Sequence, residues 1–224
     1  MATNLYPLWN TLRIAAISSV MVFFLGIFFA YYISRLPRMI KGVLDVFLTL
    51  PLVLPPTVCG YFLLVIFGVN RPIGKFLLQF GVKFVMDWHG GILAACVVAF
   101  PLMYRTARGA FENFDPNLAY SGQTLGLSNT YIFWRIRMPA CKQGILAGVV
   151  LAFARALGEY GATSMLIGYT PGRTATIATT VYQLWRTNDD RGALFWVLIN
   201  LAISAFVLLA VNLLESKQKK EVIK

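Results

Sequence analysis

Residues 14–34 read IAAISSVMVFFLGIFFAYYIS, a run of 21 residues without a charged side chain between Arg13 and Arg35. At about 1.5 Å per residue, a helix of this length crosses the ~30 Å hydrocarbon core of a bilayer. The run is too long for a signal peptide and no basic leader precedes it, so we expect a membrane helix that the chain retains. This stretch places the chain among all-α integral membrane proteins.

The composition of the whole chain agrees with that class. Hydrophobic residues make up 58% of the 224 residues, charged residues only 13%, and the mean hydropathy is +0.68. A soluble domain carries about 25% charged residues. The net charge of +11 comes from basic residues that lie between apolar runs rather than in one basic stripe. It therefore indicates membrane topology rather than binding to nucleic acid.

Four further apolar stretches follow the first, and together they predict about five membrane helices in one transmembrane domain that covers residues 1–224. The expected spans are residues 13–35, 46–69, 88–108, 142–167 and 192–214. We expect the fourth to be a single helix with Arg155 and Glu159 inside it. The outer connections are predicted to contain a short interfacial helix at residues 73–80 and a weaker one at residues 174–185.

The basic residues give the orientation of these spans. Twelve Lys and Arg residues lie on one side, in the segment after the first span, in the loop after the third and in the tail, against six in the other two loops. The positive-inside rule predicts an N-terminus outside and a C-terminus in the cytoplasm.

The long loop at residues 109–141 has helix start and stop signals of its own. Asp115 can cap a helix, Pro116 suits its first position, and Gly126 suits a left-handed exit. These residues predict a short helix at 117–125 and a second helical arm from Ser128 to Pro139. Two interpretations remain open for this helix–Gly–helix elbow, namely a connector that covers the inner end of the bundle and a docking element for a soluble partner.

Gly126, nine further residues and then Ile136-Arg137-Met138-Pro139 resemble the E-A-A-x3-G-x9-I-x-L-P signature of ABC importer permeases. The E-A-A part departs, because Tyr120, Ser121 and Gly122 stand there, and Met138 replaces the leucine. The resemblance implies that the elbow inserts into an ATPase subunit. The residues it assigns to this coupling are Asn117, Leu118, Tyr120, Ser121, Gly122, Leu125, Gly126, Ile136 and Pro139.

Two more segments are similar to the molybdate branch of this family: LPLVLPPTV at residues 50–58 and LAFARALGEYGA at residues 151–162. Sulfate and tungstate permeases carry close relatives of both. The resemblance implies a type I ABC importer permease in the plasma membrane of a prokaryote, with molybdate as substrate. Its expected partners are a cytoplasmic ATPase, an extracytoplasmic binding protein, a second permease copy and membrane lipid. Open alternatives are a tungstate or sulfate permease, and, in a different class, a stand-alone secondary transporter or channel.

Two features inside the spans are candidates for the translocation path or its gate. Pro51, Pro55 and Pro56 break the second span, and Thr57 adds a hydroxyl group beside the break. The break either improves packing or lines a path. Arg155 and Glu159 are four residues apart and so share a helical face. They either lock that helix to a neighbour or bring Arg155 to a passing anion.

No motif in the chain indicates chemistry of its own. The string at residues 68–75 lacks the spacing and the Ser or Thr of a nucleotide-binding P-loop. The three cysteines fit no metal motif and are expected to be small core residues. The single His89 has no evident metal partner. We therefore expect neither metal nor cofactor nor catalysis in this chain, and ATP hydrolysis in a separate subunit.

Overall fold

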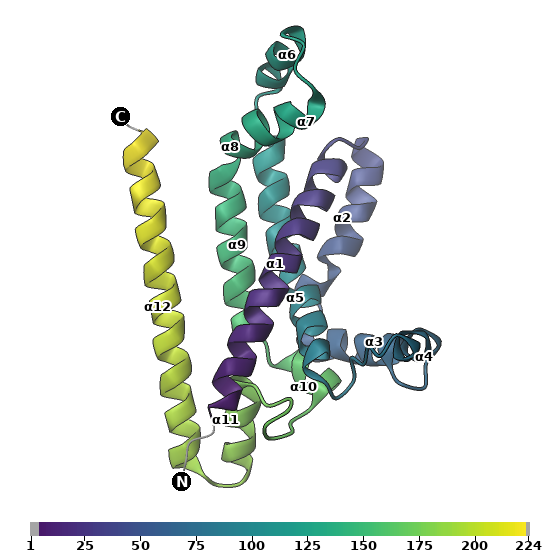
Figure 1. Cartoon of the computed structure of the whole chain (residues 1–224), viewed down its shortest axis with the longest axis vertical. Coiled ribbons are helices and arrows are strands. Elements are labelled where there is room, and N and C mark those ends of the chain that lie inside the picture. The colour runs from purple at the N-terminus through teal and green to yellow at the C-terminus, as the bar shows by residue number, and fades with distance from the viewer. Residues whose placement is uncertain (1–4, 223–224) are drawn as a thin grey trace.

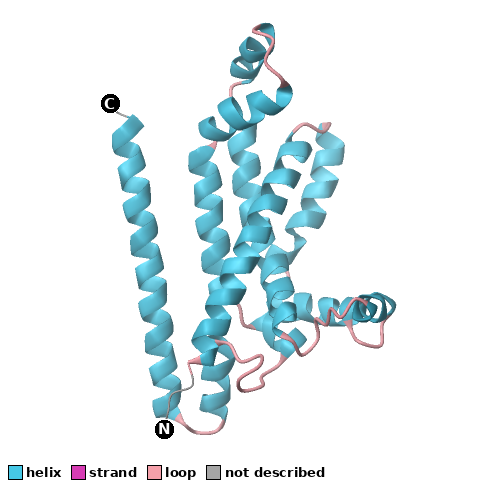
Figure 2. Cartoon of the chain, in the orientation of Figure 1, coloured by secondary structure: helices cyan, strands magenta, loops and turns pink. Residues whose placement is uncertain are grey.

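A computed structural model of the chain describes the backbone of residues 5–222 and the side chains of residues 5–209. Within that range every regular element is a helix (Figure 2). Long helices lie side by side along an elongated molecule, and a cluster of short helices projects from one end (Figure 1). The predicted all-α architecture is confirmed.

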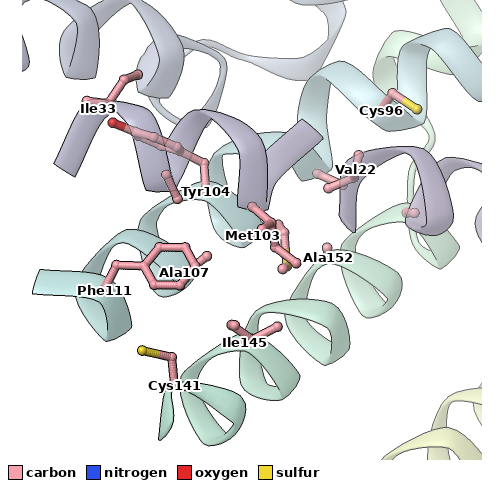
Figure 3. Packing of buried hydrophobic residues seen from close by; sticks show 14 of the residues in the cluster. Val22, Ile33, Cys96, Met103, Tyr104, Ala107, Phe111, Cys141, Ile145 and Ala152 are labelled. Carbon is pink, nitrogen blue, oxygen red and sulfur yellow. The ribbon is translucent and has the colours of Figure 1, made fainter. Parts of the chain in front are cut away.

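Three helices form the centre of the bundle: α1 (Tyr6–Ser34), α5 (Trp88–Glu112) and α9 (Lys142–Leu157). They approach one another closely because small residues lie where they cross. A side-chain carbon on Gly26 of α1 would lie 2.5 Å from Cγ of Met103 on α5, and one on Gly148 of α9 would lie 2.9 Å from Sδ of the same methionine. Figure 3 shows Met103 beside Val22 and Ala152 in this core. Backbone approach through glycine is a common way for membrane helices to gain packing contacts.

The second apolar segment is broken at Pro55 and Pro56, as predicted, whereas Pro51 lies inside a helix and does not break it. It forms α2 (Arg38–Val53) and α3 (Pro56–Phe67), whose axes differ by 111°. Leu54 and Pro55 between them are extended, with ψ of 141° and 134°. From this corner α3 runs sideways out of the bundle (Figure 1).

The prediction of one continuous helix over residues 142–167 is wrong. Helix α9 ends at Leu157, and a separate helix, α10 (Gly161–Ile167), follows after a three-residue break. The break allows α10 to pack on α3, where a side-chain carbon on Gly60 would lie 2.8 Å from the Ala162 backbone. Glycines at the break and the contact with α3 override the helical hydrophobic pattern that suggested continuity.

Both short outer helices exist. Helix α4 (Pro72–Gln79) lies where the interfacial helix was predicted and exposes Ile73 and Phe76. Helix α11 (Ile177–Arg186) covers the weaker of the two predicted segments. The three cysteines, Cys59, Cys96 and Cys141, are buried, as expected.

The last helix, α12 (Asp190–Val222), stands apart from the central helices and packs mainly on α11 (Figure 1). Only 11% of its most apolar window is buried, so it offers a long apolar surface to lipid or to another chain. Within the described residues α1, α5 and α12 are each long and apolar enough to cross a bilayer. The number reaches five if α2 with α3, and residues 129–140 with α9, each count as one bent span.

Candidate functional site

The elbow, defined here as residues 115–140, has the local structure that its sequence predicts. Its first arm is α6 (Pro116–Thr124), and the Asp115 side chain caps it by accepting a hydrogen bond from Asn117 N at 2.9 Å. Gly126 then turns the chain with φ of +75°, a conformation that costs an L-residue with a Cβ about 1–2 kcal/mol. The Leu127 amide donates back to the Gly122 carbonyl at 3.1 Å, which closes the turn.

The second arm of the elbow is more irregular than a single helix. Ser128 caps it by accepting from Tyr131 N at 3.2 Å. The arm consists of three short pieces in sequence: α7 (Asn129–Ile132), the π-helical η1 (Phe133–Arg137) and α8 (Met138–Ala140). The wide π-helical turn rotates the side chains that follow it, a detail that no sequence pattern indicated.

The predicted coupling residues divide into two groups. Gly122 and Ile136 hold the arms together, because a side-chain carbon on Gly122 would lie only 3.2 Å from Cδ1 of Ile136. The others are exposed, with large apolar surfaces on Leu118, Tyr120 and Leu125 (78% exposed) at the far end of the molecule (Figure 1). The exposed members of the set are Asn117, Leu118, Tyr120, Ser121, Leu125, Gly126 and Pro139. Exposed apolar side chains that are surrounded by polar ones are typical of a docking surface.

The two candidate path segments lie against each other. A side-chain carbon on Gly161 would lie 2.8 Å from Cβ of Pro56, so the break after α2 meets the break after α9. Thr57, in the first turn of α3, is exposed beside this contact, whereas Pro51 and Pro56 are partly buried. The structure thus brings together two interruptions that are about 100 residues apart in the chain.

Arg155 and Glu159 form an ion pair at this junction, with Arg155 Nη1 2.6 Å from Glu159 Oε2. Glu159 Oε1 accepts a hydrogen bond from Ala162 N at 2.7 Å, at the start of α10. Both carboxylate oxygens of Glu159 are therefore engaged, and its side chain is 2% exposed. The Arg155 side chain keeps 28% of its surface exposed, so the arginine is the member of the pair that can still meet a solute.

Sequence reasoning missed a charge cluster that joins α2 to α5. Arg108 pairs with Asp45, and Lys41 Nζ lies 3.0 Å from Glu112 Oε1. Arg108 and Lys41 are among the twelve basic residues that the charge count assigns to one side of the membrane, and nothing further was predicted for them. Lys41 and Asp45, like Arg108 and Glu112, are four residues apart, so each helix presents a cation and an anion on one face. That complementary spacing was the available signal.

These features define a helical membrane protein with an exposed elbow at one end, and the comparisons identify it as a transport permease and give its family. The model of the binding-protein-dependent transport system inner membrane component matches residues 22–220, and the chain belongs to that family. The "Molybdenum transport system permease protein ModB" of Escherichia coli (strain K12) is 42% identical over 209 residues, or 91% of each chain. The "Sulfate transport system permease protein CysT" of Salmonella typhimurium is 29% identical over 95% of this chain and 77% of that protein.

Solved structures of ABC transporters share the fold. A bacterial alginate ABC transporter in complex with alginate pentasaccharide-bound periplasmic protein matches with a TM-score of 0.78, over 98% of this chain and 81% of that one, at 17% identity. The MetNI methionine ABC transporter in inward-facing form matches with a TM-score of 0.72, over 93% and 92% of the two chains, at 12% identity. The resemblance seen in the sequence is confirmed at the level of family and fold.

Glu159 both pairs with Arg155 and accepts a hydrogen bond from the Ala162 amide, and the two interactions can be separated by mutation. Glu159→Gln keeps an acceptor for the Ala162 amide but loses the ion pair, and Glu159→Ala loses both. We expect both to lower the unfolding temperature of the purified protein, with the larger fall for Ala, because each unpaired buried group costs about 1–3 kcal/mol. Exchanging the two residues should not restore stability, since an arginine at 159 cannot accept a hydrogen bond.

The matched control for this series is Glu112→Gln, which removes an exposed carboxylate whose ion pairs contribute little. Full stability of the exchanged variant would mean that the pair acts by charge alone and that the cap is dispensable.

Proposed function

We propose that this chain forms the membrane path of an ABC importer for an oxyanion, most specifically molybdate. The observation that carries the proposal is the 42% identity to the molybdenum transport permease over 91% of both chains. The sulfate permease at 29% identity supports sulfate as the second candidate within the same class. A tungstate permease is the third, since the sequence segments that favour molybdate are similar in that branch.

An oxyanion importer of this kind needs an energy source. For a dianion, an inside-negative potential of 100 mV opposes entry by about 4.6 kcal/mol. We place ATP hydrolysis in a separate cytoplasmic subunit and substrate capture in an extracytoplasmic binding protein, as the family name of a binding-protein-dependent system suggests. Two copies of the permease would then enclose the path between them, and α12 has apolar surface to spare for such contacts.

The arrangement of the helices supports an N-terminus outside and a C-terminus in the cytoplasm. The end of α1, the start of α2, the end of α5 and the elbow all lie at one end of the molecule (Figure 1). This end gathers the basic segments that the charge count assigns to the cytoplasm. The same end presents the exposed elbow, where a cytoplasmic ATPase would dock.

Within the path, we assign different roles to the two charged residues at the α9–α10 break. Glu159 positions the break by capping α10 and pairing with Arg155. Arg155 is partly exposed next to the proline corner and supplies positive charge to a passing oxyanion. Thr57 lies exposed in the first turn of α3 and offers a hydroxyl group near the same corner.

The direct test of the substrate is uptake of radiolabelled molybdate by proteoliposomes that contain the permease, its ATPase and its binding protein. We expect ATP-dependent uptake of molybdate. A tenfold excess of unlabelled tungstate or sulfate should reduce this uptake only as far as the binding protein has affinity for that competing anion. Uptake by the permease alone, without ATPase, would contradict the assignment to an importer and favour a stand-alone carrier.

The orientation is testable with single cysteines in a variant that lacks the three buried native ones. Asn70→Cys, on the connection between α3 and α4, should react with an impermeant maleimide in intact cells. Leu125→Cys, at the tip of the elbow, should react only after the cells are opened, in a strain without the ATPase that would cover this surface. Both positions are exposed, so a failure to label reports the side of the membrane rather than burial. The reverse pattern would overturn the topology.

Coupling is tested at Gly126, where φ is +75° but nothing lies within 4 Å of an added side-chain carbon. Gly126→Val should therefore strain the turn without a local clash, and reduce co-purification of the ATPase and substrate-stimulated ATP hydrolysis. Gly126→Asn is the matched control, because asparagine tolerates the left-handed conformation. Wild-type coupling in the valine variant would show that the elbow is only a connector.

A further inference from the structure

A groove of about 450 Å³ lies between the cytoplasmic-side half of α1 and the second arm of the elbow. Exposed aromatic rings of Phe24, Phe28 and Tyr32 form its α1 wall, and Trp134, 57% exposed, stands on the elbow wall. The rings of Tyr31 and Phe133 meet edge to face at 4.6 Å and join the two walls. The groove is therefore mostly apolar, and contacts between two elements far apart in the chain hold its walls together.

One end of this groove carries uncompensated positive charge. The Arg35 guanidinium lies 3.9 Å from the centre of the Tyr31 ring and donates to the Tyr31 hydroxyl. The Arg137 guanidinium lies outside the lining of the groove, 5.4 Å from the centre of the same ring and 4.6 Å from that of Phe114. Among residues 5–209, neither arginine forms an ion pair with a carboxylate. Burial and the neighbouring charge of Arg35 lower the pKa of Arg137, which remains a cation at neutral pH.

The polar residues and the length of the groove also indicate what kind of ligand it fits. Asn129 and Thr130, at the start of the second elbow arm, are exposed beside the charged end. The groove follows α1 from Phe23 to Arg35, which at 1.5 Å per residue is about 18 Å. One leaflet of the hydrocarbon core is about 15 Å thick. An acyl chain that lies along α1 thus spans the apolar part and leaves its headgroup at the arginines.

We infer that this groove binds an anionic phospholipid of the inner leaflet. Its phosphate pairs with Arg35 beside the polar start of the elbow arm, Arg137 adds positive charge from beside Tyr31, and one acyl chain lies against Phe24 and Phe28. A second copy of this chain fits the groove less well. With a net charge of +11, it has no excess of acidic groups to place against the arginines. The bound lipid connects α1 to the elbow, so its headgroup charge affects how firmly the elbow is held. The proposed function enters only in naming the leaflet, and the binding itself does not depend on transport.

The test is native mass spectrometry of the purified full-length chain with dioleoylphosphatidylglycerol or dioleoylphosphatidylcholine added to the detergent. We expect the wild type to retain phosphatidylglycerol at activation energies that remove phosphatidylcholine. The double variant R35Q/R137Q should weaken phosphatidylglycerol binding by about 30-fold, since two positive charges are lost. The matched control R38Q/R135Q removes the same net charge at exposed arginines that neither line the groove nor lie against the Tyr31 ring, and it should leave binding unchanged.

Three outcomes would overturn the inference. Equal losses in both double variants would mean general attraction to a basic surface. Displacement of phosphatidylglycerol by inorganic phosphate at equal concentration would mean a free-anion site. A shift between monomer and dimer in R35Q/R137Q without a change in lipid binding would make the groove an interface between copies. If the double variant fails to fold, Arg35→Gln alone, at an exposed position, should still weaken binding about fivefold.

Discussion

Close packing of α1, α5 and α9 around Met103 is the contact on which the rest of the molecule depends. In a bilayer, apolar side chains gain little from leaving lipid for another helix, so close approach and van der Waals contact must hold the bundle together. Gly26 and Gly148 provide that approach from two sides of one methionine. The centre is therefore rigid, and the bent, exposed and charged elements are attached to it.

The interruptions in the helices have a shared physical logic. Inside a membrane, broken backbone is tolerated only where protein or water satisfies the freed groups. Here the proline corner after α2 packs on the break after α9, and Glu159 supplies the acceptor that starts α10. A carboxylate that caps a helix and pairs with an arginine offsets its own burial, while the arginine keeps an exposed face. The helix cap at Glu159 and the candidate substrate contact at Arg155 thus lie within about one helical turn of each other.

The elbow projects from the bundle but is joined to it by specific side-chain contacts. Gly122 and Ile136 join the two arms, and the Tyr31–Phe133 contact joins the second arm to α1. The second arm also contacts α5, where the Phe111 and Phe133 ring centres are 6.3 Å apart, and it leads directly into α9. The proposed docking surface at the tip is thus connected to the central helices, and the proposed lipid site adjoins one of these connections.

The sequence by itself determined the class, the family and much of the local structure. Uncharged runs of membrane length, the capping signals at Asp115 and Gly126, and the prolines after α2 each act through neighbours in the chain, so pattern alone revealed them. Family membership followed from spaced motifs, and the comparisons confirmed it. The break at residues 158–160 was missed because apolar residues resume directly after it, while the contact with α3 that favours it comes from about 100 residues away. The pairing of Asp45 with Arg108 and the joining of the two breaks were likewise decided only by tertiary structure: spacing within each helix can indicate a charged face, but packing chooses the partner.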